Sequence, residues 1–255
     1  MRSPYPYIPA EPYTRSWAKS SYNALQASID RKAGNLTYLL AYTWSKTIDY
    51  GQDGYFSQND IQDPNHWQND RSVAGFDLPH VFSASWVYAL PFGPGKRWLS
   101  ASGFLGQVIG NWQLNGIATL SSGQPYTITV PVQIQNINNV IGEERPNLVG
   151  DPYAGSTSLQ PLNPAAFAVP APFTFGSLGR NTFRTDWHRN LDLSLFRQFP
   201  FSERSRLEFR AEAFNVTNTP VFAIPAAFVS DPNFAQVSST ANTERQIQLA
   251  LKLYF

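Results

Sequence analysis

Hydrophobic and polar residues alternate along seven segments of the chain, each about ten residues long. Alternation with a period of two is typical of a β-strand that has one apolar and one polar face. The clearest example comes last, where one side of an extended chain carries Ile247, Leu249, Leu251, Leu253 and Phe255. The seven predicted strands are Tyr22–Arg31, Leu36–Lys46, His80–Leu90, Trp112–Ser121, Asn190–Gln198, Arg206–Asn215 and Arg245–Phe255. The pattern predicts an all-β fold with strands longer than the usual five or six residues.

The connections between these strands are alternately short and long. The short ones are Ala33–Asn35, Pro91–Arg97 with its continuation, and Phe199–Glu203, and the long ones are Thr47–Pro79, Ser122–Arg189 and Thr217–Glu244. Transmembrane barrels of the outer membrane have short turns on the periplasmic side and long loops outside. If the last strand runs inward, all three short connections fall on the periplasmic side and all three long ones fall outside. We therefore expect an antiparallel up-and-down transmembrane β-barrel, with the apolar face of each strand toward lipid.

The polar face of the sixth segment carries a ladder of alternating charges. Its members are Arg206, Glu208, Arg210 and Glu212, which we expect to face the lumen. They form a cross-strand ion-pair network in a watery interior, or they line a substrate path or hold a plug. In the fifth segment Phe196 breaks the alternation and falls on the polar side.

Composition agrees with a membrane barrel and narrows the alternatives. Aromatic residues make up 15% of the chain, which suits interfacial belts, and no Cys is present for a disulfide or a thiolate metal site. A net charge of +1 leaves no electrostatic footprint for nucleic acid. Seven is an odd number of strands, whereas bacterial barrels have even numbers. We expect residues 1–255 to be the C-terminal portion of a larger barrel, preceded by a Pro-rich loop over Met1–Ala18.

The segment Asp49–Arg71 is rich in oxygen ligands, but its spacing does not match the twelve-residue calcium loop. A solvated polar loop is the favoured interpretation. A contact with ligand outside the cell is the alternative, through Asp53, Asp60, Asp63, His66, Asp70 and Arg71. The second long loop contains Glu143–Pro152 and Arg180–Phe183, and it either folds over the pore mouth or lies on the surface. The three His residues lack metal-ligand spacing and no Gly-x-Ser-x-Gly elbow occurs, so we expect no metal, no cofactor and no enzymatic activity.

Several motifs resemble TonB-dependent outer-membrane receptors of the Oar-like branch. They are Tyr22–Asp30, Tyr42–Asp49, Asp77–Phe82, Asn111–Thr119, Ser122–Tyr126 and Leu207–Asn215. The resemblance implies a 22-stranded barrel in the outer membrane, occluded by an N-terminal plug and driven by a TonB-type energy-coupling protein. The terminal apolar set ending at Phe255 resembles the signal read by the barrel-assembly machinery. Expected partners are thus outer-membrane lipid, that machinery, the plug and the coupling protein. A soluble secreted carbohydrate-binding β-sandwich and a passive porin are the alternatives.

Overall fold

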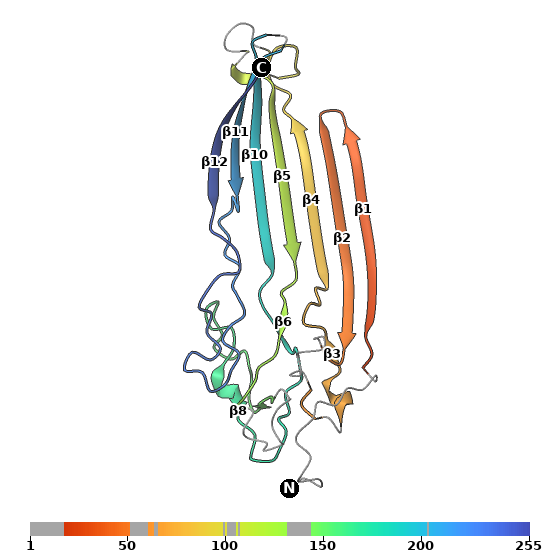
Figure 1. Cartoon of the computed structure of the whole chain (residues 1–255), viewed down its shortest axis with the longest axis vertical. Helices are drawn as coiled ribbons and strands as arrows, with labels where there is room; N and C mark the ends of the chain where they lie inside the picture. Colours follow the sequence, from red (N-terminus) through yellow and green to blue (C-terminus); the bar gives the residue numbers. More distant parts are fainter. Residues whose placement is uncertain are drawn as a thin grey trace.

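The computed structural model describes residues 18–51, 61–63, 66–98, 100, 106, 108–131, 144–202 and 204–255. The predicted loop over Met1–Ala18 lies outside these residues except for its last position. The described part is one tall antiparallel sheet with a folded cap at one end (Figure 1). Among the described residues no helix is long and apolar enough to cross a membrane.

Seven long strands build the sheet, and they lie side by side in chain order. Their bounds are β1 Ser21–Ala33, β2 Leu36–Asp49, β4 His80–Ala89, β5 Trp112–Ser121, β10 His188–Pro200, β11 Arg206–Phe214 and β12 Gln246–Tyr254. Each coincides with one of the predicted segments, and the observed strands β1, β2 and β10 run several residues beyond the prediction. A two-residue strand, β3 (Ser72–Val73), pairs with the outer end of β2. The expectation of an all-β antiparallel sheet is confirmed.

The sheet is open, because β1 and β12 form its two edges and do not pair with each other. In lipid every backbone polar group needs a partner, so these edges have to be covered by further strands. The strands are also staggered. Their outer ends extend farthest at β1 and β2 and least at β11 and β12 (Figure 1). Strands of a barrel tilt in this way relative to the membrane normal.

Cross-strand register separates the two faces of the sheet cleanly. One row across the sheet joins Leu40, Ala84, Ala118 and Leu191, and the row next to it joins Ala41, Ser83, Thr119 and Asn190. No second layer covers the apolar face within the described residues. On the last strand, Leu249 is 67% exposed and Leu251 is 68% exposed. Contact of this apolar face with water would be unfavourable, whereas hydrocarbon covers it favourably.

Short turns join β1 to β2 and β10 to β11 at the inner ends of the strands. At the β1–β2 turn Gly34 has a φ of 59°, which a residue without Cβ adopts at little cost. The β4–β5 connection is longer than the predicted turn, since β4 ends at Ala89 and β5 begins at Trp112. Within it Phe92 bridges to Trp98, and the Arg197 guanidinium of β10 donates to the carbonyl of Val108. This connection therefore packs back against the inner end of the sheet.

One aromatic residue on the lipid-facing side lies over a glycine of the next strand. Trp86 of β4 is directly opposite Gly116 of β5, and a Cβ added at Gly116 would overlap the indole ring. We expect Gly116→Ala to destabilise the sheet by about 1–3 kcal/mol, because the ring must leave its place. Urea unfolding in lipid vesicles measures the effect. In a Trp86→Ala background the same change should cost far less, and an equal cost in both backgrounds would contradict this packing.

The long outer connections are folded rather than irregular. They contain the short strands β6 (Pro125–Tyr126), β7 (Asn147–Leu148), β8 (Phe167–Ala168) and β9 (Phe183–Arg184), and 3₁₀ turns at Trp67–Asp70 and Pro164–Ala166. Strand β6 pairs with β9 and β7 pairs with β8. Their buried core consists of Tyr126, Ile128, Leu162, Ala166, Phe167, Leu178, Phe183, Phe234 and Ala235. We call this unit, built from the described residues of the three long connections, the cap.

Candidate functional site

Three ion pairs, two of them buried and the third with a partly exposed arginine, hold the cap to the outer end of the sheet. Arg145 reaches Asp70 at 2.5 Å, and both side chains are at most 2% exposed. Arg184 reaches Asp77 at 2.5 Å, and Arg180 pairs with Asp49. In each pair the arginine comes from the second long connection and the aspartate from the first. A charge taken out of water is tolerated only when it is paired and hydrogen-bonded, so these contacts fix how the two connections meet.

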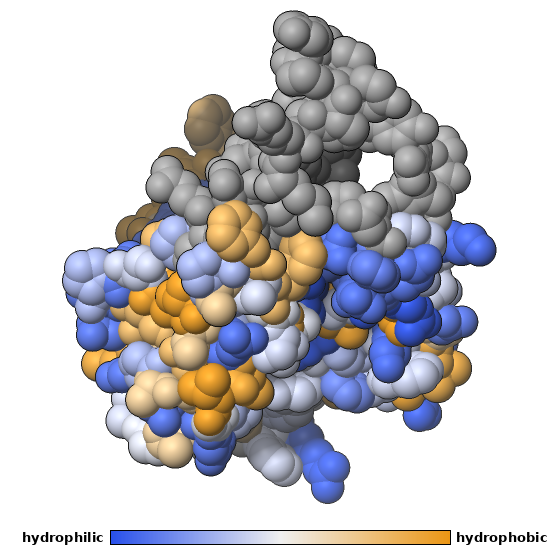
Figure 2. Space-filling view, turned by 90° about the horizontal axis from the view of Figure 1, so that it is seen from below, coloured by the Kyte–Doolittle hydropathy of each residue, from blue (hydrophilic) through white to orange (hydrophobic). Residues whose placement is uncertain are grey.

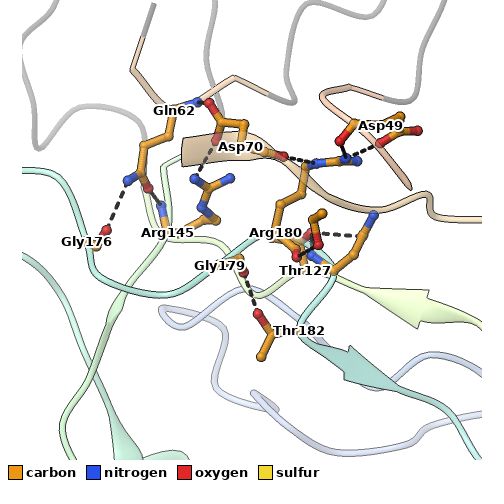
Figure 3. A network of polar contacts seen from close by, with 11 residues as sticks. Asp49, Gln62, Asp70, Thr127, Arg145, Gly176, Gly179, Arg180 and Thr182 are labelled. Atoms are coloured by element: carbon orange, nitrogen blue, oxygen red, sulfur yellow. Dashed lines mark hydrogen bonds and ion pairs between the residues drawn. The ribbon is translucent and has the colours of Figure 1, made fainter. Parts of the chain in front are cut away.

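Further hydrogen bonds complete this network (Figure 3). The Arg180 Nε donates to the Asp70 backbone carbonyl at 3.2 Å, so one guanidinium contacts both Asp49 and Asp70. The Gln62 side chain accepts from the Arg145 backbone at 3.0 Å and donates to the Gly176 carbonyl at 3.0 Å. The first long connection is thereby joined to the second at several points.

The residues predicted to contact ligand outside the cell differ in exposure where the structure describes them. Asp53 and Asp60 lie outside the described residues. Asp63 pairs with His66 at 2.6 Å, and the His66 side chain is 71% exposed. Arg71 is exposed, whereas Asp70 is buried beneath the cap and held by Arg145. Within the described ranges no group of three His, Cys, Asp or Glu side chains is placed to hold a metal ion.

The favoured interpretation of Asp49–Arg71 as a solvated polar loop is wrong for two of its carboxylates. Asp49 is 6% exposed and Asp70 is 1% exposed. Their partners Arg145 and Arg180 lie 75 and 131 residues away along the chain. The sequence of this segment gives no indication of partners so far away along the chain. The two aspartates can be buried because each is paired with an arginine.

The described part of the second long connection folds at the outer end of the sheet, and its place over a pore mouth stays a prediction. Its segments Glu143–Pro152 and Arg180–Phe183 supply Arg145 and Arg180 to the network, although Glu143 is outside the described residues. Burial raises the pKa of the Tyr126 phenol in the cap core, and nearby Tyr153 and Asp186 raise it further. The interior of the cap is therefore well shielded from water.

The charged ladder on β11 lies on the polar face of the sheet, as do all the carboxylates of the long strands. Glu208 pairs with Arg210 along the same strand, and Gln198 of β10 donates to Glu208 at 3.1 Å. The guanidinium of Arg210 lies 4.6 Å from the ring centroid of Phe196, which explains why that residue departs from the alternation. The contacts across the strands are thus mainly cation–π, with Arg206 lying 4.3 Å from the Tyr254 ring.

A hollow of about 420 Å³ crosses this face at mid-height, and apolar side chains such as Leu39, Val87 and Ile117 line it beside polar ones. It reaches from Asp30 on β1 to Glu212 on β11 and so spans six neighbouring strands. Its polar lining comprises Asp30, Thr37, Ser85, Asn115, Asp192, Ser194 and Glu212. A second hollow, of about 460 Å³, lies at the outer end of β10–β12 and is lined by His188, Asn190, Asn242 and Gln246 among others. The polar face is therefore a continuous wall with room for water or another polypeptide.

Seen from the cap end, hydrophobic side chains form separate groups among hydrophilic ones (Figure 2). Among the large hydrophobic residues of the cap, the largest exposed fractions belong to Phe173 at 71%, Phe76 at 62% and Val149 at 61%. The outer surface is thus mixed in character. A surface of this kind faces water and is available to contact solutes.

A staggered antiparallel sheet with an apolar outer face, short inner turns and a folded outer cap defines the wall of an outer-membrane β-barrel. The family model described as "Outer membrane beta barrel domain" matches residues 1–248, so the chain belongs to that family and resides in the outer membrane. That location disagrees with the alternative of a soluble secreted protein. The comparison with curated proteins found no match, and the comparison with solved structures found none either.

Proposed function

We propose that this chain forms part of the wall and the outer cap of a TonB-dependent receptor that takes up a nutrient across the outer membrane. The observation that carries the proposal is the open sheet, in which seven long strands lie side by side without closing. In an eight-stranded barrel, side chains from opposite walls fill the interior. A sheet of seven strands whose two edges do not meet fits a wider barrel, in which a plug occupies the lumen.

The sequence motifs that resemble the Oar-like branch support the same proposal. Several of them form the sheet itself, including Tyr42–Asp49 on β2 and Leu207–Asn215 on β11. The unpaired edges of β1 and β12 support a barrel with further strands, of which residues 1–255 are the C-terminal portion. In this proposal the ladder on β11 contacts the plug, and the terminal strand with Ile247 and Phe255 is read by the barrel-assembly machinery. The chain has no enzymatic role.

A passive porin shares this wall but contains no plug, and conductance separates the two. The native protein isolated from the outer membrane and inserted into a planar lipid bilayer is expected to pass no steady ion current, because a plug fills the lumen. It is also expected to cross-link to the inner-membrane energy-coupling protein in intact cells. A steady current from the untreated protein, together with no cross-link, would establish a porin and reject energy-coupled transport.

A further inference from the structure

Charged residues on the lipid-facing side of the long strands occur only near the strand ends, and all of them are basic. At the outer end they are Lys46 on β2, Arg189 on β10 and Arg245, which directly precedes β12. At the inner end they are Arg31 and Arg197. The carboxylates of these strands, Asp30, Asp49, Asp192, Glu208 and Glu212, alternate onto the polar face. The outer end of the lipid-facing side is therefore purely cationic.

The register gives the offsets between the three outer cations along their strands. The row through Tyr42 leads by way of Phe82 and Leu120 to Arg189, so Lys46 lies four residues outward of Arg189. Arg245 lies one residue beyond the Phe214–Gln246 pair, which places it two residues inward of Arg189.

This offset matches the tilt of barrel strands. With neighbouring strands about 4.8 Å apart and tilted by about 40°, the membrane plane shifts by roughly 1.2 residues at each strand. Three steps from β2 to β10 give about 3.6 residues and two steps from β10 to β12 give about 2.4, close to the observed offsets of four and two. The stagger of the strands in Figure 1 runs in the same direction.

The thickness of the apolar band places this level at the outer boundary of the hydrocarbon. On each of the three strands an apolar residue lies ten positions inward of the cation: Leu36 below Lys46, Phe199 below Arg189 and Phe255 below Arg245. Ten residues at about 3.3 Å each, tilted by about 40°, span roughly 25 Å, which is the height of the apolar band of outer-membrane barrels. The cations therefore lie where acyl chains end and headgroups begin.

Aromatic side chains lie beside the cations, as expected at this depth. The Tyr42 hydroxyl is 2.8 Å from Nδ1 of His80, and the His80 ring stacks on Trp187 with centroids 5.9 Å apart. Trp44, two residues inward of Lys46, is 45% exposed. Within the described residues Lys46, Arg189 and Arg245 form no ion pair, so their charges are available to an anion from outside the protein.

We propose that Lys46, Arg189 and Arg245 bind the phosphate groups of a phosphorylated glycolipid in the outer leaflet, whose acyl chains cover the apolar face below them. Along the membrane plane the tilt puts Lys46 and Arg189 roughly 19 Å apart and Arg189 and Arg245 roughly 13 Å apart. One inorganic phosphate cannot reach two of them, whereas neighbouring lipid headgroups can occupy all three. The inference depends on the outer-membrane location and not on energy-coupled transport.

Retention of a fluorescent, acylated glucosamine disaccharide bisphosphate by the full chain in detergent micelles tests the proposal. We expect each cation to strengthen binding about fivefold, so a Lys46→Gln, Arg189→Gln, Arg245→Gln variant should bind on the order of 100-fold more weakly. The charge-preserving variant Lys46→Arg, Arg189→Lys, Arg245→Lys should retain binding. The unaltered chain should bind the dephosphorylated glycolipid as weakly as the glutamine variant binds the bisphosphate. Excess inorganic phosphate should not displace the bisphosphate from the unaltered chain.

The matched control is a variant with three cations removed at the inner turns, Lys96→Gln, Arg97→Gln and Arg204→Gln, which should bind like the unaltered chain. Circular dichroism shows whether each variant has folded. Equal retention of the bisphosphate by the folded glutamine variant, or equal loss in the inner-turn control, would overturn the proposal. So would equal binding of the dephosphorylated glycolipid. None of these results would bear on the conductance test of transport.

Discussion

Replacing Arg145 with Met is expected to destabilise the cap by about 3–5 kcal/mol, because the Asp70 carboxylate would remain buried without its cation. Met has a similar length and fills much of the same space, so the lost charge dominates the effect. Hydrogen exchange of cap amides, compared with those of β10 and β11, measures the change and shows whether it is confined to the cap.

Two variants distinguish loss of this pair from general damage. Arg145→Met combined with Asp70→Asn removes both charges and should be milder than Arg145→Met alone. His66→Gln breaks a pair whose histidine is 71% exposed, and it should leave cap exchange nearly unchanged. Cap exchange that stays the same after Arg145→Met would show that the buried pair does not stabilise the cap.

Replacing Leu193 with Arg is expected to destabilise the sheet by about 2–4 kcal/mol, since position 193 lies near the middle of the apolar band. On β10 that band runs from Arg189 to Phe199. The neighbouring change Ser194→Arg places the same side chain on the polar face and should cost much less. Urea unfolding in lipid vesicles, followed by tryptophan fluorescence, provides both values.

Depth adds a second control for this prediction. Phe199→Arg places the new charge at the inner boundary of the band, where the cost of a lipid-facing cation falls to about 0–1 kcal/mol. If position 193 tolerated Arg as well as position 199 or position 194 did, the apolar side of β10 would not face hydrocarbon.

Most of the wall was predictable from the sequence because a strand with one face toward lipid and one toward water repeats every two residues. Trp112–Ser121 was predicted with the bounds that β5 has, and the ends of β10 and β12 were misplaced by one or two residues. The up-and-down order predicted from the connections gave the right neighbours, since each long strand pairs with the next long strand along the chain. The alternation placed Phe196 on the polar face but gave no reason for an aromatic ring there, because the Arg210 guanidinium that packs on it belongs to the next strand.

The cap was not predictable in the same way. Its strands have only two residues each, too few for a period to be visible, and its core joins Tyr126 to Phe234 across more than a hundred residues. The ion pairs were missed for a related reason, because Asp77 and Arg184 are separated by 107 residues. The arginines among the Gly- and Pro-rich residues of the second long connection were the only indication of these ion pairs in the sequence. Because an arginine in such a segment is more often exposed to water, the indication was weak.

The placement of the three aspartates has a mechanical consequence. Asp49 is the last residue of β2, and Asp77, which also accepts from the Thr47 backbone at 2.6 Å, lies three residues before His80, the first residue of β4. The third long connection, by contrast, contributes Phe234 and Ala235 to the cap through apolar contacts. Moving the cap away from the sheet at the β2–β4 side would break ion pairs to residues at the ends of these strands. Moving it away at the β11–β12 side would break no ion pair among the described residues. The structure thus anchors one side of the cap to the wall and makes the opposite side the easier one to open.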